Sequence, residues 1–172
     1  RVDYQNEYGT FFLPRLSGMF SINEKLTARV GGGLGYKTPT IFTEDAERIH
    51  FRNVTPINVE DTEAENSIGG NLDFNYRGDL SKEIGFTINT LFFYTKVDKP
   101  IILSYSLTDE FVYVQPDGFI DTKGLETNVK FSYKDFKLFV GYTLADVQMN
   151  YNGLATKMPL VSRHRLNNVL MY

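Results

Sequence analysis

The sequence contains no cysteine and no tryptophan, and it has only two histidines and six prolines among 172 residues. Without cysteine, a disulfide or a thiolate metal site is excluded. The net charge of −3 and the pI of about 5.4 lack the basic excess of nucleic-acid-binding proteins, so we expect no nucleic-acid partner. No apolar run of about 18 residues occurs, which excludes a membrane-spanning helix but not membrane-crossing β-strands, whose signal is weaker.

The aromatic content, 14 Phe and 11 Tyr, favours β-structure. The clearest strand is "KLTARVGGGLGYK", residues 25–37, where even positions are mostly apolar and odd positions are charged or very small. This period of two predicts a strand with one apolar and one polar face. The glycines here are not a nucleotide-binding loop, because Tyr36 stands where that motif needs glycine and Pro39 disfavours the required helix start.

The same alternation recurs along most of the chain and predicts about seven long strands. The other six segments are 15–23, 67–77, 84–96, 124–133, 136–145 and 165–172. Short links alternate with long ones at about 38–66, 98–121 and 146–162, which predicts an all-β, antiparallel up-and-down meander with its long loops at one end. Within the loop at 98–121, "KPIILSYSLTDEFVYVQPDGF" predicts a small hairpin with Asp109 and Glu110 at its tip.

Strand length and sidedness favour a membrane barrel over a soluble sheet. Several strands reach ten to twelve residues, and a tilted strand needs about nine to eleven to cross a bilayer. In the first six strands the apolar side carries no charge before Lys96, and tyrosines lie near the strand ends, as at an interfacial aromatic girdle. Seven strands cannot close, so we expect an arc of a larger barrel. The alternative is a soluble or surface-attached β-module that binds carbohydrate or protein.

Five stretches resemble the barrel of TonB-dependent outer-membrane receptors: "LTARVGGGLGYKTPTIFTEDAE" with its preceding hairpin "PRLSGMFSINEKLTARV", then "TKGLETNVKFSY", "FVGYTLAD" and "MPLVSRHRLNNVLMY". The resemblance implies that residues 1–172 are part of a 22-stranded transmembrane barrel, without the plug domain and the remaining strands. It implies a non-enzymatic receptor without cofactors in the outer membrane of a Gram-negative bacterium, which imports a ferric siderophore, another metal chelate, cobalamin or a glycan. Its implied partners are outer-membrane lipid, its own plug, the TonB complex acting through the plug, and the small-molecule nutrient.

The polar strand face supplies the first set of candidate site residues, expected to face the lumen and to contact substrate or plug, with hydration or mutual pairing as the simpler alternative. They are Arg29, Lys37, Asn71, Asp73, Asn75, Arg77, Glu126, Asn128 and Lys130. On the same face, Gly31, Gly33 and Gly35 are expected to leave space for the plug.

Outer-loop residues form the second candidate set, in which exposed aromatic rings would suit a flat chelate or a sugar ring, although packing of the hairpin against neighbouring loops is the simpler expectation. They are Glu60, Asp61, Glu63, Glu65, Tyr105, Phe111 and Tyr113. The four acids do not match a calcium-binding loop motif, so we expect a solvated loop. We expect no metal site and no catalytic residues, because His50 and His164 lack partners at zinc-motif spacing and no nucleophile–base pair stands out.

Overall fold

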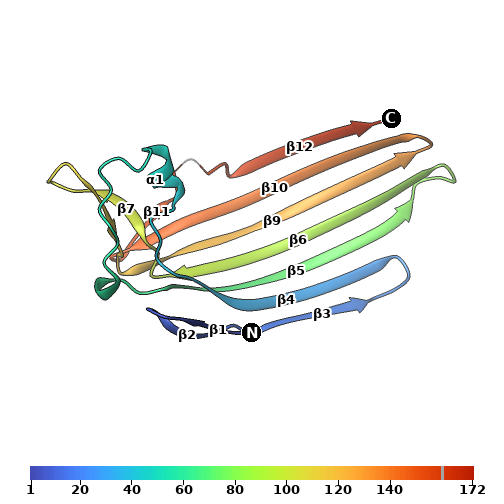
Figure 1. Ribbon diagram of the computed structural model, residues 1–172. Coiled ribbons are helices and arrows are strands. Elements are labelled where there is room, and N and C mark those ends of the chain that lie inside the picture. Colours follow the sequence, from blue (N-terminus) through green and yellow to red (C-terminus); the bar gives the residue numbers. More distant parts are fainter. Residues whose placement is uncertain (160) are drawn as a thin grey trace.

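The computed structural model describes residues 1–159 and 161–172, and one long antiparallel sheet dominates it (Figure 1). Its seven long strands are β3 (Arg15–Ser21), β4 (Leu26–Lys37), β5 (Glu65–Asp79), β6 (Ile84–Asp98), β9 (Gly118–Tyr133), β10 (Phe136–Tyr151) and β12 (His164–Met171). Neighbours in the sheet follow this order, and the short β11 (Leu154–Lys157) pairs with β10 beyond the end of β12. The predicted antiparallel meander of seven long strands is therefore confirmed.

Smaller elements lie outside this sheet. They are the hairpin of β1 (Val2–Gln5) and β2 (Gly9–Phe12), the helix α1 (Glu44–Arg48), the 3-10 turn η1 (Val59–Asp61), and the hairpin of β7 (Ile102–Tyr105) and β8 (Phe111–Val114). The β7–β8 hairpin confirms the one predicted in the loop at 98–121. No helix in the described part of the chain is both long and apolar enough to span a membrane.

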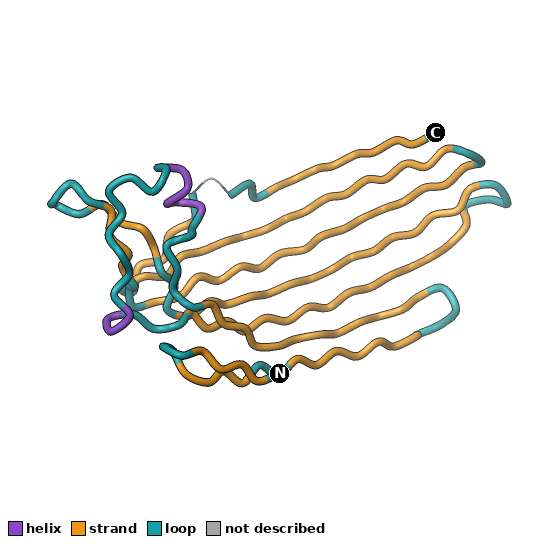
Figure 2. The backbone as a smooth tube through the Cα atoms, viewed as in Figure 1, coloured by secondary structure: helices purple, strands orange, loops and turns teal. Residues whose placement is uncertain are grey.

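The connections separate by length onto the two ends of the sheet (Figure 2). Short turns join β3 to β4, β5 to β6 and β9 to β10, whereas the segments after β4 and β6 are long and carry α1 and the β7–β8 hairpin. The third long loop, predicted at 146–162, differs in the structure, because β10 continues to Tyr151 and returns as β11. Asn152 and Gly153 make that two-residue turn with positive φ angles of 51° and 79°, as a type I′ turn requires.

One face of the sheet is apolar and uncovered. Leu16, Val30, Leu72 and Phe92, from four different strands, keep between 39% and 81% of their surface exposed. Among the described residues the buried apolar side chains are Ala46, Ala64 and Pro100, and all three lie in the long connections that follow β4 and β6. The apolar face thus packs against no second sheet in this structure, which is the arrangement of a barrel wall and not of a sandwich.

The outer limit of this apolar face runs diagonally across the sheet. Going towards the long loops, this apolar side ends at Tyr36, Ile68, Tyr94, Leu125, Leu144 and Leu166 on β4, β5, β6, β9, β10 and β12. Thr90, Thr127 and Asn168 are polar residues further inside it, and Phe119 of β9 lies beyond it. In the strand register, this limit lies two residues further from the long loops on each strand than on the strand before it. The one exception is the step from β9 to β10, where the limit stays at the same level.

This diagonal gives the tilt of the strands. Eight residues of retreat correspond to about 26 Å along the strands, against about 24 Å across five strand spacings. A planar boundary that cuts the sheet in this way makes an angle of about 45° with the strands, which is the tilt of transmembrane β-strands. On β6 the apolar side from Ile84 to Tyr94 then spans about 23 Å along the normal, close to the ~25 Å apolar band of outer-membrane barrels.

Candidate functional site

The polar face of the sheet brings the nine predicted strand residues onto one side. Residues paired across an antiparallel ladder share a face. Arg29 pairs with Asp73, and Lys37 pairs with Glu65. The remaining members follow through β6 in the rows Asn71–Phe93, Asn75–Asn89–Asn128, Leu91–Glu126 and Arg77–Thr87–Lys130. The common face of these residues is therefore observed, while their contact with substrate or plug stays a prediction.

Several of these polar side chains bind one another. Asn89 donates a hydrogen bond of 3.0 Å to the carboxylate of Asp73, and Asn128 donates one of 2.7 Å to Glu126. The ammonium of Lys37 lies 3.8 Å from the carboxylate of Glu65. Some polar side chains of this face therefore pair with one another, which is the mutual pairing named above as the simpler alternative.

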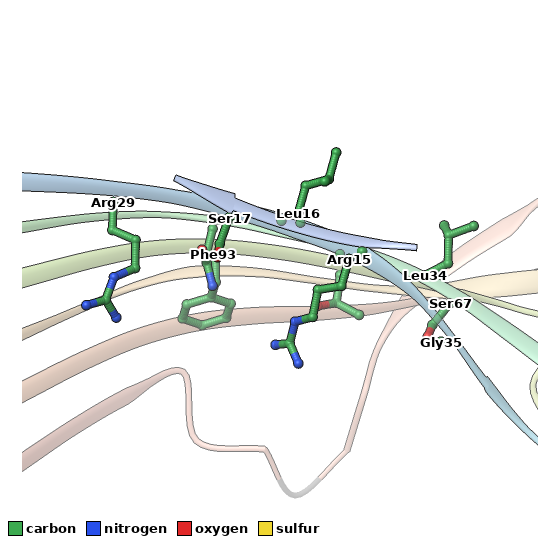
Figure 3. Close-up of a pocket in the computed structure, with 15 residues that line it drawn as sticks. Arg15, Leu16, Ser17, Arg29, Leu34, Gly35, Ser67 and Phe93 are labelled. Carbon is green, nitrogen blue, oxygen red and sulfur yellow. The ribbon is translucent and has the colours of Figure 1, made fainter. Parts of the chain in front are cut away.

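A hollow of about 610 Å³ lies on this face over β3, β4 and β5 (Figure 3). Arg15, Arg29 and Phe93 project to its side of the sheet, whereas Leu16 and Leu34 project to the opposite side. Its floor contains the glycines of β4 and Gly69 and Gly70 of β5. Two guanidinium groups thus lie beside a floor of glycines in this hollow. Such a surface suits a partner that carries carboxylates.

The glycines of this floor have a local use in addition to the predicted one. A Cβ at Gly31 would lie 2.9 Å from Asn71 Oδ1, and a Cβ at Gly35 would lie 2.7 Å from Ser67 Oγ. Each glycine therefore lets the side chain paired with it lie flat across the neighbouring strand. The side chains therefore rise little above the polar face of β4 and β5. This leaves the space in which a plug was expected, while the plug contact itself stays a prediction.

The sequence analysis missed Arg15, Ser17, Ser67, Phe93 and Thr95, which also line the hollow. Arg15 pairs with Gly33 and Phe93 pairs with Asn71, so both share the polar face. The signal was available, because each residue has the parity of the polar side within its own strand. The candidate set held only charged and amide side chains, so it left out hydroxyl groups and an aromatic ring on that side, and it also omitted Arg15.

The outer-loop candidate residues lie where the segment 38–64 contacts the β7–β8 hairpin. Phe111 of β8 donates a backbone hydrogen bond to Asn53 (2.7 Å) and accepts one from Thr55 (2.9 Å), which forms a bridge between Val54 and Phe111. The hydroxyl of Tyr113 donates to the backbone oxygen of Ile41 at 2.7 Å. The segment 38–64 and the β7–β8 hairpin therefore form one unit, here called the outer-loop platform.

Gln115 joins this platform to the ends of two long strands. Its amide nitrogen donates to the backbone oxygens of Glu63 (2.9 Å) and Lys99 (2.7 Å), and its amide oxygen accepts from the Glu63 N–H at 2.9 Å. Glu63 also forms an ion pair with Lys99. Gln115 was not among the predicted site residues, because a single glutamine in a loop carries no pattern in the sequence.

The four predicted acidic residues do not converge. Glu60 and Asp61 lie in η1, Glu63 pairs with Lys99, and Glu65 accepts a 2.7 Å hydrogen bond from the Ile101 N–H. Among the described residues, no group of three or more His, Asp or Glu side chains is placed to hold a metal ion. The acidic segment thus binds neighbouring strands and loops.

The predicted aromatic residues of the hairpin also pack locally. The rings of Tyr105 and Phe111 are 5.0 Å apart in an edge-on arrangement, and the Tyr105 hydroxyl bonds to Asp109. Tyr105 nevertheless keeps 60% of its surface exposed, and Phe42 on the facing loop keeps 72%. Both rings are therefore accessible on the platform.

Tyr151 is the last residue of β10. Burial and the nearby charge of Glu65 raise the pKa of its phenol.

Comparisons with known proteins agree on the architecture. The family described as "TonB dependent receptor-like, beta-barrel" matches residues 1–172. The solved structure of the siderophore receptor PirA from Pseudomonas aeruginosa matches with a TM-score of 0.67 over 98% of this chain, at 14% sequence identity. This chain covers 32% of that receptor, and a likeness at this identity shows the fold alone. None of the curated proteins matches the sequence.

Proposed function

Because the chain belongs to the TonB-dependent receptor-like β-barrel family, we propose that it forms an arc of an outer-membrane barrel whose intact protein imports a scarce nutrient. The family consists of outer-membrane receptors and transporters and not of enzymes. In this proposal the energy comes from TonB, transmitted through a plug domain inside the barrel. The candidate nutrients are a ferric siderophore, another metal chelate, cobalamin or a glycan.

The diagonal limit of the exposed apolar face is the observation that carries the proposal. Hydrocarbon ends at a plane, and a plane crosses tilted strands along a diagonal of their register. The side chains that a soluble module would enclose are instead exposed on a single sheet. A soluble or surface-attached β-module that binds carbohydrate or protein is therefore the weaker hypothesis, although it accounts equally well for the alternation along each strand.

The polar face then lines the inside of the barrel. The hollow over β3, β4 and β5 would receive the plug, with Arg15 and Arg29 paired to its carboxylates. The flat glycine floor permits this close approach. On the other strands, Glu126, Asn128 and Lys130 would face water or nutrient in the lumen.

The outer-loop platform would make the first contact with the nutrient. Tyr105 of β7 and Phe42, in the segment before α1, have exposed rings. The elements β7 and α1 lie at the end of the sheet where the long loops gather (Figure 1). Rings of this kind stack on flat chelates and sugars. The solved structure matched above is a siderophore receptor, so a ferric siderophore is the first nutrient to test.

Growth on single nutrient sources tests this proposal. The complete gene would be deleted in its host, and growth would be measured with individual ferric siderophores, cobalamin or glycans as the only source of the limiting nutrient. We expect loss of growth on at least one source, restored by the wild-type gene only when the TonB system is active. Uptake of every source unaffected by the deletion, or a gene product in the soluble fraction, would refute the proposal.

A pair of variants then tests the platform. Tyr105→Ala should weaken nutrient binding about fivefold, since one stacked ring contributes on the order of 1 kcal/mol. Leu80→Ala is the matched control, because Leu80 is 64% exposed but lies in a turn at the opposite end of the sheet. Equal binding by both variants would remove Tyr105 from the site.

A further inference from the structure

The side of the sheet that carries the polar face becomes apolar near the long loops. Val97 of β6 pairs with Ile120 of β9, and Ile120 pairs with Met149 of β10, so these three residues share that side. Val147 lies two residues before Met149 on the same strand and therefore faces the same way. All four are half-buried, and they are here called the upper apolar patch.

The upper apolar patch lies beyond the outer limit of the apolar face, here called the apolar limit. Two of its residues lie three positions past this limit on their own strands, and the other two lie five positions past it. At the inferred tilt these positions are about 7–12 Å outside the hydrocarbon. Lipid therefore does not account for the patch, and apolar side chains that face an aqueous lumen favour contact with an apolar partner.

The inward residues around the patch are uncharged. On β6, β9 and β10, all of whose residues the structure describes, the other inward positions past the apolar limit are Thr95, Gly118, Thr122, Gly124, Ala145 and Tyr151. An anion that left water at this wall would find no ammonium or guanidinium group among them, so the cost of its desolvation would not be offset. A glycan would find few side-chain hydroxyl groups to pair with its own.

The outer-loop platform, at the same end of the sheet, is acidic. Its segments 38–64 and 102–114 contain eight Asp or Glu residues and two Arg residues, which gives a net charge of −6. Burial and the charge of Glu65 raise the pKa of Tyr151, so a further carboxylate lies near the patch. A nutrient with several negative charges would be repelled on its way to the patch, whereas an uncharged nutrient would not.

Phe93 connects the patch to the hollow over β3, β4 and β5. It lies on the same side of β6 as Val97, four residues away, and it lines the hollow (Figure 3). Its ring lies against Gly124 of β9, where an added Cβ would be 2.7 Å from Phe93 Cζ. Apolar groups therefore continue from the patch to the hollow that is proposed to receive the plug.

We propose that the upper apolar patch binds the nutrient, and that the nutrient is an uncharged metal chelate whose hydrocarbon groups contact this patch. This inference rests on the proposed function, because the patch faces a lumen only in a closed barrel. Contact with hydrocarbon groups removes the patch from water, and the absence of charge avoids repulsion by the platform. Ferric tris-hydroxamates and cyanocobalamin are such chelates, whereas a ferric tris-catecholate is a multiply charged anion.

Binding of these three probes to the complete receptor tests the inference. Dissociation constants of a ferric tris-hydroxamate, cyanocobalamin and a ferric tris-catecholate would be measured in detergent by isothermal titration calorimetry. The wild type should bind one of the two uncharged chelates at least about tenfold more tightly than the catecholate, because like charges at an interface are strongly unfavourable. The hydroxamate and cobalamin arms distinguish the two sources of an uncharged chelate.

Two lysine variants locate the contact. Met149→Lys places an ammonium group in the patch and should shift the ratio of the two dissociation constants about tenfold towards the catecholate. Gln148→Lys is the matched control, because Gln148 is the neighbouring residue on the opposite side of the wall, and it should leave the ratio unchanged. Loss of folded protein lowers the binding of every probe together, so it does not change this ratio.

Tighter binding of the catecholate by the wild type would overturn the inference. A ratio that Met149→Lys leaves unchanged would also overturn it, and would mean that another segment, such as the plug, covers the patch. Binding of none of the three probes would count against it equally. The growth tests described above then show separately whether the proposed function stands.

Discussion

A charge placed on the apolar face should destabilise the barrel in proportion to its depth. On β5 this face consists of Ile68, Gly70, Leu72, Phe74 and Tyr76, with Leu72 at the centre. Four residues separate Leu72 from each end, which corresponds to about 9 Å of depth at the inferred tilt. Leu72 is therefore the position on β5 that lies furthest from water on either side of the membrane.

The expected magnitude follows from this depth. Leu72→Arg should cost about 2–4 kcal/mol of folding free energy, or roughly 30- to 1,000-fold in the folding equilibrium. Ile68→Arg and Tyr76→Arg lie near the interfaces and should cost about 0–1 kcal/mol. The control is Asn71→Arg, one residue away on the polar face, which should change stability by no more than about 0.5 kcal/mol.

Guanidinium titration of the complete barrel in lipid vesicles measures these differences. The reasoning predicts a peak at residue 72 and low values at 68, 71 and 76. It would be refuted by equal costs for Leu72→Arg and Asn71→Arg, or by a profile without a maximum along the apolar side. A water-exposed apolar face would give small values throughout, because surface substitutions rarely exceed about 0.5 kcal/mol.

Three further predictions concern the loops and the wall. Gln115→Ala removes three hydrogen bonds, so amide exchange should rise together, about tenfold, in 41–63 and 102–114; a rise in one segment alone would contradict a joined platform. Gly124→Ala should destabilise by about 1–3 kcal/mol in thermal unfolding, because its Cβ would overlap the Leu144 carbonyl oxygen and lie 2.7 Å from Phe93, whereas Gly31→Ala displaces only the end of Asn71; equal costs would count against this account. The raised pKa of Tyr151 means that the fold favours the neutral phenol, so its contribution to stability is complete below pH ~10 and is lost as the pH rises above it. Tyr151→Phe should therefore flatten the plot of unfolding free energy against pH in this range. An unchanged plot would argue against the shift.

The strands were predictable where the two faces differ in solvent. Between Leu26 and Tyr36, or between Ile84 and Tyr94, most side chains on one face are apolar, because in the proposed barrel that face meets hydrocarbon and the other meets water or protein. That pattern also assigned the polar residues to a common face. The register then follows from short turns, which permit few alternatives.

The strand ends beyond the apolar limit were not predictable in the same way. On β9 and β10 the alternation inverts at the apolar limit: the outer side changes to Lys123 and Asp146, and the inner side changes to Ile120 and Val147. An inverted pattern is typical of the end of a strand, so the sequence predicted that these strands stop at 124 and 145. In the structure they extend to 118 and 151. The interlocked platform was also hidden, since it depends on backbone contacts between distant loops.

Attachment of spin labels to single cysteines tests the central claim most directly, and this chain contributes no native cysteine to interfere. Labels placed at each position of 66–78, 84–98 and 119–133 in the complete protein in bilayers would be scored for collision with oxygen and with a water-soluble nickel complex. We predict oxygen maxima at every second residue, ending at Ile68, Tyr94 and Leu125, a limit that retreats by two residues from strand to strand. Nickel accessibility on both faces, or a limit that follows one register row across the strands, would contradict a tilted wall in a membrane.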